Sequence, residues 1–199
     1  RKVSHSYTMR LQENYATMNL NDTFSAIRFI FKFTFLFEFI GAILLTIFWH
    51  SGSIPIQKTL FLALFHAISA FCNAGFSLFS NSLVTYQFHS PTILIMSFLI
   101  ILGGLGFPVL FNIYQRFFTK NYSQIKIQTK LALSITLLLI ILGTILIFFT
   151  EFSHSMIHLS IFEKLKLSYF QSVTTRTAGF FTLSTTLLHP GTIMICIIL

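Results

Sequence analysis

Two short segments of the chain share the residues Ala-Gly-Phe, and each follows a short helix-forming run. Residues 73–76 spell Asn-Ala-Gly-Phe, and residues 177–180 spell Thr-Ala-Gly-Phe. A glycine just after a helix can adopt backbone angles that other residues avoid, so successive carbonyls can point toward one axis. The negative end of the helix dipole favours a cation at the same place. These segments therefore predict that main-chain oxygen atoms bind a cation such as potassium.

The expected ligands are main-chain carbonyls, and their side chains need no charge. The carbonyls belong to Asn73, Ala74, Gly75, Thr177, Ala178 and Gly179. We expect Phe76 and Phe180 to support the two turns. Two segments of this kind supply half of a ring of ligands, so four units would close a pore.

Two charged residues lie near these turns within apolar sequence, Glu38 and Arg176. An unpaired charge inside a membrane is costly, so we expect Arg176 to be tethered to a carboxylate or to helix carbonyls. Glu38, Glu151 and Glu163 are the candidate carboxylates. For Glu38 we favour a structural role over that of a proton carrier, and for Glu151 a solvated charge at the outer mouth.

The histidines and cysteines do not support enzymatic chemistry. His154 and His158 share the i, i+4 spacing of one helix face, but no third ligand or catalytic carboxylate string follows them. Cys72 and Cys196 form no CxxC pair. The sequence predicts no transition metal, no cofactor and no catalytic residue; potassium is expected only as the transported ion.

The composition places the chain in a membrane. Of 199 residues, 54% are hydrophobic and only 9% are charged, and 26 are Phe. Soluble domains carry about 25% charged residues, so a soluble enzyme is nearly excluded. The net charge of +8 comes from basic residues between apolar runs, where they set orientation, so it does not indicate nucleic-acid binding.

Hydropathy predicts an all-α integral membrane protein with long spans and short half-helices. Spans are expected at 29–49, 91–115 and 131–150, with a further span from residue 190. The apolar runs 59–72 and 165–174 are too short to cross a bilayer core of about 30 Å at about 1.5 Å per residue. The run Gly103–Pro108 is expected to bend the second span and to permit close packing.

Basic residues predict the orientation. They concentrate in segment 1–28, a predicted surface helix, and in loop 116–130, so both should face the cytoplasm. The loops after the first and third spans should face outward. Each half-helix must then enter and leave on the outer side, as a re-entrant pore loop.

The chain therefore consists of two similar units: span, re-entrant half-helix, glycine turn, span. We assign residues 29–115 to the first pore repeat and 131–199 to the second, which is truncated in its last span. The motif Phe-x-x-[Ile/Val]-[Ser/Thr] precedes Ala-Gly-Phe in both.

Four strings resemble the Trk/Ktr/HKT potassium transporters, and most closely the bacterial Ktr/Trk membrane subunit. They are residues 38–42 (Glu-Phe-Ile-Gly-Ala), 71–77 (Phe-Cys-Asn-Ala-Gly-Phe-Ser), 103–109 (Gly-Gly-Leu-Gly-Phe-Pro-Val) and 175–180 (Thr-Arg-Thr-Ala-Gly-Phe). The resemblance covers nearly the whole chain. It implies a potassium-channel-like fold and the second and third of four repeats, with the first and fourth repeats absent.

The same resemblance implies potassium uptake without covalent chemistry. It implies an inner-membrane homodimer that binds a cytoplasmic nucleotide-binding regulatory subunit. Glycine at both filter positions, Gly75 and Gly179, goes with potassium preference in this family.

Two alternatives stay open at the level of sequence. One is a re-entrant-loop carrier for another solute, which would need half-helix N-termini facing an anion. The other is a membrane scaffold or enzyme that transports nothing.

Overall fold

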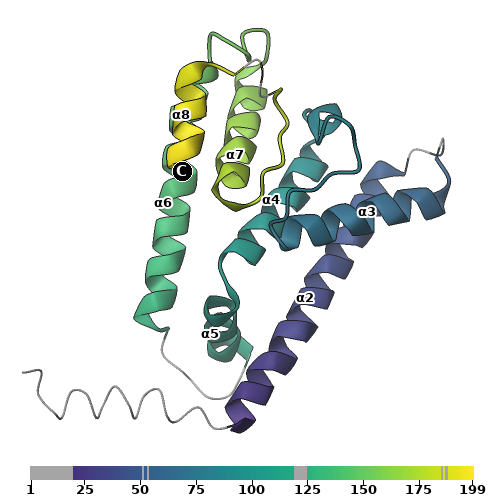
Figure 1. Cartoon of the computed structure of the whole chain (residues 1–199), viewed down its shortest axis with the longest axis vertical. Helices are drawn as coiled ribbons and strands as arrows, with labels where there is room; N and C mark the ends of the chain where they lie inside the picture. Colours follow the sequence, from purple (N-terminus) through teal and green to yellow (C-terminus); the bar gives the residue numbers. More distant parts are fainter. Residues whose placement is uncertain (1–19, 51, 53, 119–124, 185, 187) are drawn as a thin grey trace, which may run out of the picture.

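The computed structural model describes residues 20–50, 52, 54–118, 125–184, 186 and 188–199 (Figure 1). Every regular element in these residues is helical. The elements are α2 (Leu20–Trp49), α3 (Ile56–Phe71), the 3-10 helix η1 (Val84–Tyr86), α4 (Ser90–Gly104), α5 (Phe107–Phe118), α6 (Ile127–Glu151), α7 (Ile161–Thr177) and α8 (Pro190–Ile198). The predicted all-α membrane fold is confirmed. The predicted surface helix 1–28 lies outside the described residues up to residue 19, and its last residues begin α2.

Among the residues that the structure describes, two single helices are long and apolar enough to cross a membrane. They contain the 23-residue stretch Ile27–Trp49 of α2 and the 25-residue helix α6. Large apolar side chains on both, such as Phe35 and Leu138, are exposed. An apolar surface of this kind is stable against lipid and unstable against water.

The predicted span 91–115 is not one continuous helix. It consists of α4 and α5, whose axes differ by 97°. The chain turns at Gly106, whose φ of +81° suits glycine. Pro108 then lies in the first turn of α5, where its missing N–H costs no helical hydrogen bond. The chain bends within the expected run Gly103–Pro108, and at this bend α4 ends at Gly104 and α5 begins at Phe107.

The two predicted half-helices, α3 and α7, end at the glycine turns. α3 has 16 residues, which corresponds to about 24 Å and falls short of a bilayer core. α7 has 17 residues and begins at Ile161, four residues before the predicted start at 165. A capping box explains the earlier start: Ser160 Oγ accepts from Glu163 N, while the Glu163 carboxylate accepts from Ser160 N at 3.0 Å.

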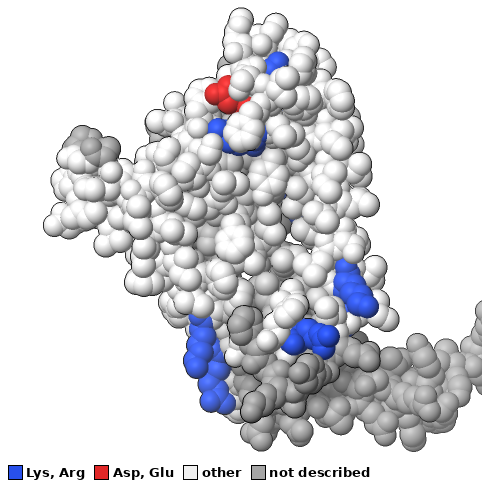
Figure 2. Space-filling view, turned by 180° about the vertical axis from the view of Figure 1, so that it is seen from behind, with Lys and Arg blue, Asp and Glu red and all other residues white. Residues whose placement is uncertain are grey.

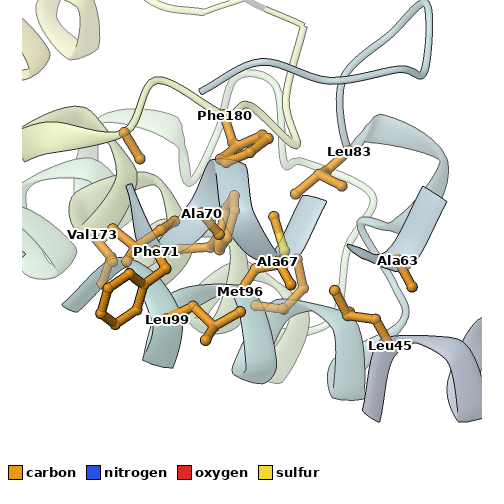
Figure 3. Close-up of a cluster of buried hydrophobic side chains, with 14 of the residues drawn as sticks. Leu45, Ala63, Ala67, Ala70, Phe71, Leu83, Met96, Leu99, Val173 and Phe180 are labelled. Atoms are coloured by element: carbon orange, nitrogen blue, oxygen red, sulfur yellow. The ribbon is translucent and has the colours of Figure 1, made fainter. Parts of the chain in front are cut away.

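The two units share one core. α4 packs against α3 within its own unit and against α7 of the second unit. Val173 and Phe180 of the second unit join Ala70, Phe71 and Leu99 of the first (Figure 3). Beyond the turns the backbones also pair, since Leu83 N donates to Phe181 O at 3.0 Å. The turns are therefore held from both sides by a common packed structure.

Charged residues are distributed unequally between the two ends of the molecule. Figure 2 shows patches of Lys and Arg without acidic residues near the end at which α2 and α6 begin, and both basic and acidic residues near the opposite end. Arg28 and Lys32 belong to the first half of α2, Arg116 to the last turn of α5, and Lys126 and Lys130 to the start of α6. The asymmetry of charge seen in the sequence is thus an asymmetry along the length of the molecule.

Candidate ion-binding turns

The first turn begins at the C-terminus of α3. Cys72 caps the helix, and Asn73 then has a φ of +52°, a left-handed conformation that asparagine tolerates better than most residues. Ala74 N donates back to Ser69 O at 2.8 Å. Gly75 follows with a φ of +71°. Two left-handed residues within three positions redirect the chain away from the helix axis.

The second turn repeats this design with fewer residues. The amides of Ala178 and Gly179 both donate to Thr174 O, at 2.9 and 3.0 Å, which closes the end of α7. Gly179 has a φ of +89°, and a side chain at this position would meet no atom within 4 Å. The space beside Gly179 is therefore open.

The two turns touch each other. A Cβ placed on Gly75 would collide with the carbonyl oxygen of Ala178 and lie 3.5 Å from the carbonyl carbon of Gly179. Residues separated by about 100 positions in sequence thus form one site. Both turns follow helix C-termini, where partial negative charge from unpaired carbonyls collects. The arrangement places two helix C-termini together, which favours a cation over an anion.

Side chains behind the first turn fix its shape. Ser69 Oγ donates to Phe76 O at 2.8 Å. His66 is fully buried, with Nδ1 2.7 Å from Leu62 O and Nε2 3.0 Å from Ser77 Oγ. The Leu62 carbonyl can only accept, so Nδ1 carries the proton and Nε2 accepts from Ser77. These roles are not predicted from the sequence; the signal for them is the spacing of polar residues within an apolar half-helix.

The two phenylalanines of the repeated motif have different surroundings. Phe180 is 1% exposed and packs in the shared core, whereas Phe76 is 70% exposed. Phe180 therefore supports the site by packing. The Phe76 side chain contributes little buried surface to the described residues, although its carbonyl accepts from Ser69.

Arg176 and Glu38 do not meet. Arg176 donates to Thr136 Oγ1 at 3.4 Å and lines a small cavity with Gly104 and Thr177. Glu38 is 7% exposed, and Cys72 Sγ donates to its Oε1 at 3.8 Å. Glu38 thus contacts the residue that caps α3.

The other two carboxylates expected near Arg176 also have different partners. Glu151 is completely buried and accepts from Thr192 Oγ1, Ser155 Oγ and His189 N. It ties the end of α6 to the start of α8, so the expectation of a solvated charge is wrong. Glu163 belongs to the capping box of α7.

Histidine, cysteine and carboxylate side chains are dispersed. Within the described ranges, no three of them lie close enough to hold a metal ion. The histidine pair at i, i+4, His154 and His158, lies in the exposed loop that follows α6.

Comparison with known proteins identifies the family to which the chain is similar. The family model described as TrkH, cation transport protein, matches residues 3–199. The Ktr system potassium uptake protein B of Bacillus subtilis is 37% identical over 207 residues, covering 100% of this chain and 44% of that protein. The potassium/sodium uptake protein NtpJ of Enterococcus hirae is 34% identical, covering 98% of this chain and 43% of its own length. In Vibrio alginolyticus, a Ktr system potassium uptake protein B is 35% identical over 85% of this chain and 37% of its own length.

The chain spans less than half the length of these relatives. Three observations agree with one another. The helices follow the order long helix, short helix and glycine turn in both units. The two turns are in contact, and the family match covers almost every residue. The chain belongs to the TrkH family of cation transport proteins, which are membrane transporters and not enzymes.

Proposed function

We propose that this chain forms half of a pathway for potassium uptake across the cell membrane. The observation that carries the proposal is the contact between Gly75 and the carbonyl of Ala178, which joins two cation-favouring helix ends at one site. Relatives named as potassium uptake proteins support the choice of ion.

Main-chain oxygens perform the selection in this proposal. Carbonyls of residues 73–75 and 177–179 replace part of the hydration shell of potassium as the ion passes. The C-terminal ends of α3 and α7 add partial negative charge without a titratable group. The remaining ligands come from two further repeats of the full-length protein.

The membrane arrangement follows from the charges. α3 and α7 act as re-entrant half-helices that approach from the outer side, within pore repeats 29–115 and 131–199. The end at which α2 and α6 begin faces the cytoplasm. We assign loop 116–130 and the N-terminal segment to the same side of the inner membrane because their sequences are basic. This face would receive a cytoplasmic nucleotide-binding regulatory subunit, and the full-length protein would form a homodimer.

Rubidium uptake tests the proposal. A full-length chain that carries this segment is expressed in cells lacking their own potassium uptake, and 86Rb⁺ and labelled amino acids are offered in parallel. We expect rubidium uptake that Gly75→Asp and Gly179→Asp abolish. Asn81→Asp, which places the same carboxylate on an exposed residue just beyond the first turn, should retain it.

Two results would contradict the proposal. One is uptake of amino acid with no uptake of rubidium, which would indicate another class of carrier. The other is undiminished rubidium uptake by both aspartate variants at equal amounts of membrane protein.

A further inference from the structure

We infer that the side chain of Asn73 is a positioning residue that clamps the two ion-binding turns to each other and to the end of α4. The inference rests on the proposed function and adds a role for a side chain where only main-chain oxygens were expected. It makes the selectivity of the pathway depend on an amide that need not touch the ion.

The Asn73 amide lies among three partners from two other segments. In the orientation that satisfies all of them, its oxygen accepts from Gly104 N at 3.0 Å. Its nitrogen donates to Ile100 O and to Thr177 Oγ1, both at 3.2 Å. Thr177 is the corresponding residue of the second turn, two positions before its glycine. One side chain therefore connects the first turn, the second turn and α4.

The contact with α4 has a specific geometry. Ile100 and Gly104 are an i−4, i pair, the two residues whose carbonyl and amide face each other in an α-helix. The Asn73 amide contacts both groups, and α4 ends at Gly104, just before the 97° break. A polar side chain that contacts such a pair is a known cause of helix bending. Asn73 thus binds α4 at the place where the helix stops.

Glycine at 103 makes this approach possible. A Cβ on Gly103 would collide with Phe71 O and lie 3.0 Å from the side-chain amide of Asn73. At Gly104, by contrast, a Cβ would meet its nearest neighbour, Thr177 Oγ1, at an ordinary 3.6 Å. The close contact between the end of α3 and α4 therefore requires glycine at position 103 but not at position 104.

The backbone of Asn73 needs the same residue for a different reason. Its φ of +52° lies in the left-handed region, which asparagine adopts more readily than other side-chain-bearing residues. Glycine can also adopt this conformation but supplies no amide. The two contributions of Asn73 can therefore be separated by substitution.

Carbonyl positions determine which ion fits, so loosening the clamp should weaken discrimination before it stops transport. Loss of one hydrogen bond corresponds to about a three- to tenfold change in an equilibrium constant. Asn73→Gly keeps the backbone conformation and removes three bonds, so at about threefold for each bond we expect sodium to compete with rubidium at about thirtyfold lower concentration. Thr177→Val removes one bond and should lower this concentration about threefold, whereas Thr177→Ser should restore it.

The experiment measures 86Rb⁺ uptake by the full-length chain at increasing sodium concentration. KM and maximal rate are determined separately, and each variant is normalised to its amount in the membrane. Asn81→Gly is the matched control, since it makes the same substitution at an exposed asparagine just after the turn. The double variant Asn73→Gly/Thr177→Val should be no worse than Asn73→Gly alone, because the Thr177 bond is already lost.

The outcomes separate this inference from the function on which it depends. Rubidium uptake by the unsubstituted chain with unchanged sodium competition in Asn73→Gly would overturn the clamp and leave the proposed function standing. Additive effects of the two substitutions would also overturn it. Absence of rubidium uptake by the unsubstituted chain would overturn the proposed function, and the inference with it.

If Asn73→Gly fails to reach the membrane, Thr177→Val decides the matter. Thr177 is exposed, so its substitution should not prevent folding. Sodium competition unchanged between Thr177→Val and Thr177→Ser would then contradict the clamp.

Discussion

The carbonyl oxygen of Ala178 lies against the α-carbon of Gly75, so closely that no other residue fits at position 75. Gly179, the corresponding glycine, has a similar left-handed φ but open space beside it. The two turns therefore use their glycines differently: Gly75 needs both its backbone freedom and its lack of a side chain, while Gly179 needs only the former.

This difference predicts unequal effects of one substitution. Alanine costs about 1–2 kcal/mol of left-handed strain at either position. At Gly75 it must also push the second turn away. We expect Gly75→Ala to reduce 86Rb⁺ uptake by the full-length chain at least about tenfold, which corresponds to 1.4 kcal/mol or more, and Gly179→Ala to reduce it less. Equal losses in the two variants would contradict the close approach of the turns.

Gly103 and Gly104 provide a second matched pair, this time for stability. Gly103→Ala places a methyl group against Phe71 O, so α3 and α4 must separate; Gly104→Ala does not. Overpacking of a core typically costs about 1–3 kcal/mol. We expect a lower midpoint of thermal unfolding in detergent for Gly103→Ala and little change for Gly104→Ala. A midpoint unchanged by Gly103→Ala would show that α3 does not approach α4 as described.

The capping box of α7 gives a prediction about pH. Hydrogen bonds from Ser160 hold the pKa of the Glu163 carboxyl below its usual value. Because the charged form is favoured in the folded state, the stabilisation is complete above the unfolded pKa and is lost as pH falls through the folded one. Ser160→Ala should destabilise α7 by about 1 kcal/mol at neutral pH.

The measurement is thermal unfolding of wild type and Ser160→Ala at neutral pH and in acid. The difference between their midpoints should shrink as the pH falls below the ordinary range for a glutamate. A difference that stays constant across that range would argue against the Glu163 half of the box.

Glu38 should be structural. Its Oε1 accepts from Cys72 Sγ, and the carboxamide of glutamine can accept in the same way. We therefore expect Glu38→Gln to leave the pH profile of rubidium uptake unchanged, whereas Glu38→Leu should lower the amount of folded protein. A pH profile that flattens or shifts in Glu38→Gln would instead indicate that Glu38 exchanges protons during transport.

Local sequence signals predicted much of the fold. The apolar runs gave α2 and α6 to within about ten residues at their ends, and the glycine turns were placed directly after α3 and α7. The start of α7 at Ile161 can also be predicted from the sequence, because Ser160 and Glu163 have the spacing of a capping box. The break after Gly104 was underestimated: hydropathy is continuous across it, and hydropathy carries no information about helix direction.

The relationships between the two units could not be predicted from local patterns. The contact of Gly75 with Ala178, the hydrogen bond of Asn73 with Thr177 and the pairing of Leu83 with Phe181 join residues about 100 positions apart. No periodicity within a helix encodes such contacts. The burial of Glu151 was missed for the same reason, since its partner Thr192 belongs to α8.

The most direct measurement of the central claim is the position of the ion itself. A full-length chain that carries this segment would be crystallised in rubidium, and anomalous scattering would locate the cation. We expect a rubidium peak within about 3 Å of carbonyl oxygens from both turns, residues 73–75 and 177–179, since carbonyls that replace hydration must touch the ion. A rubidium peak elsewhere in the membrane, with both turns unoccupied, would contradict it.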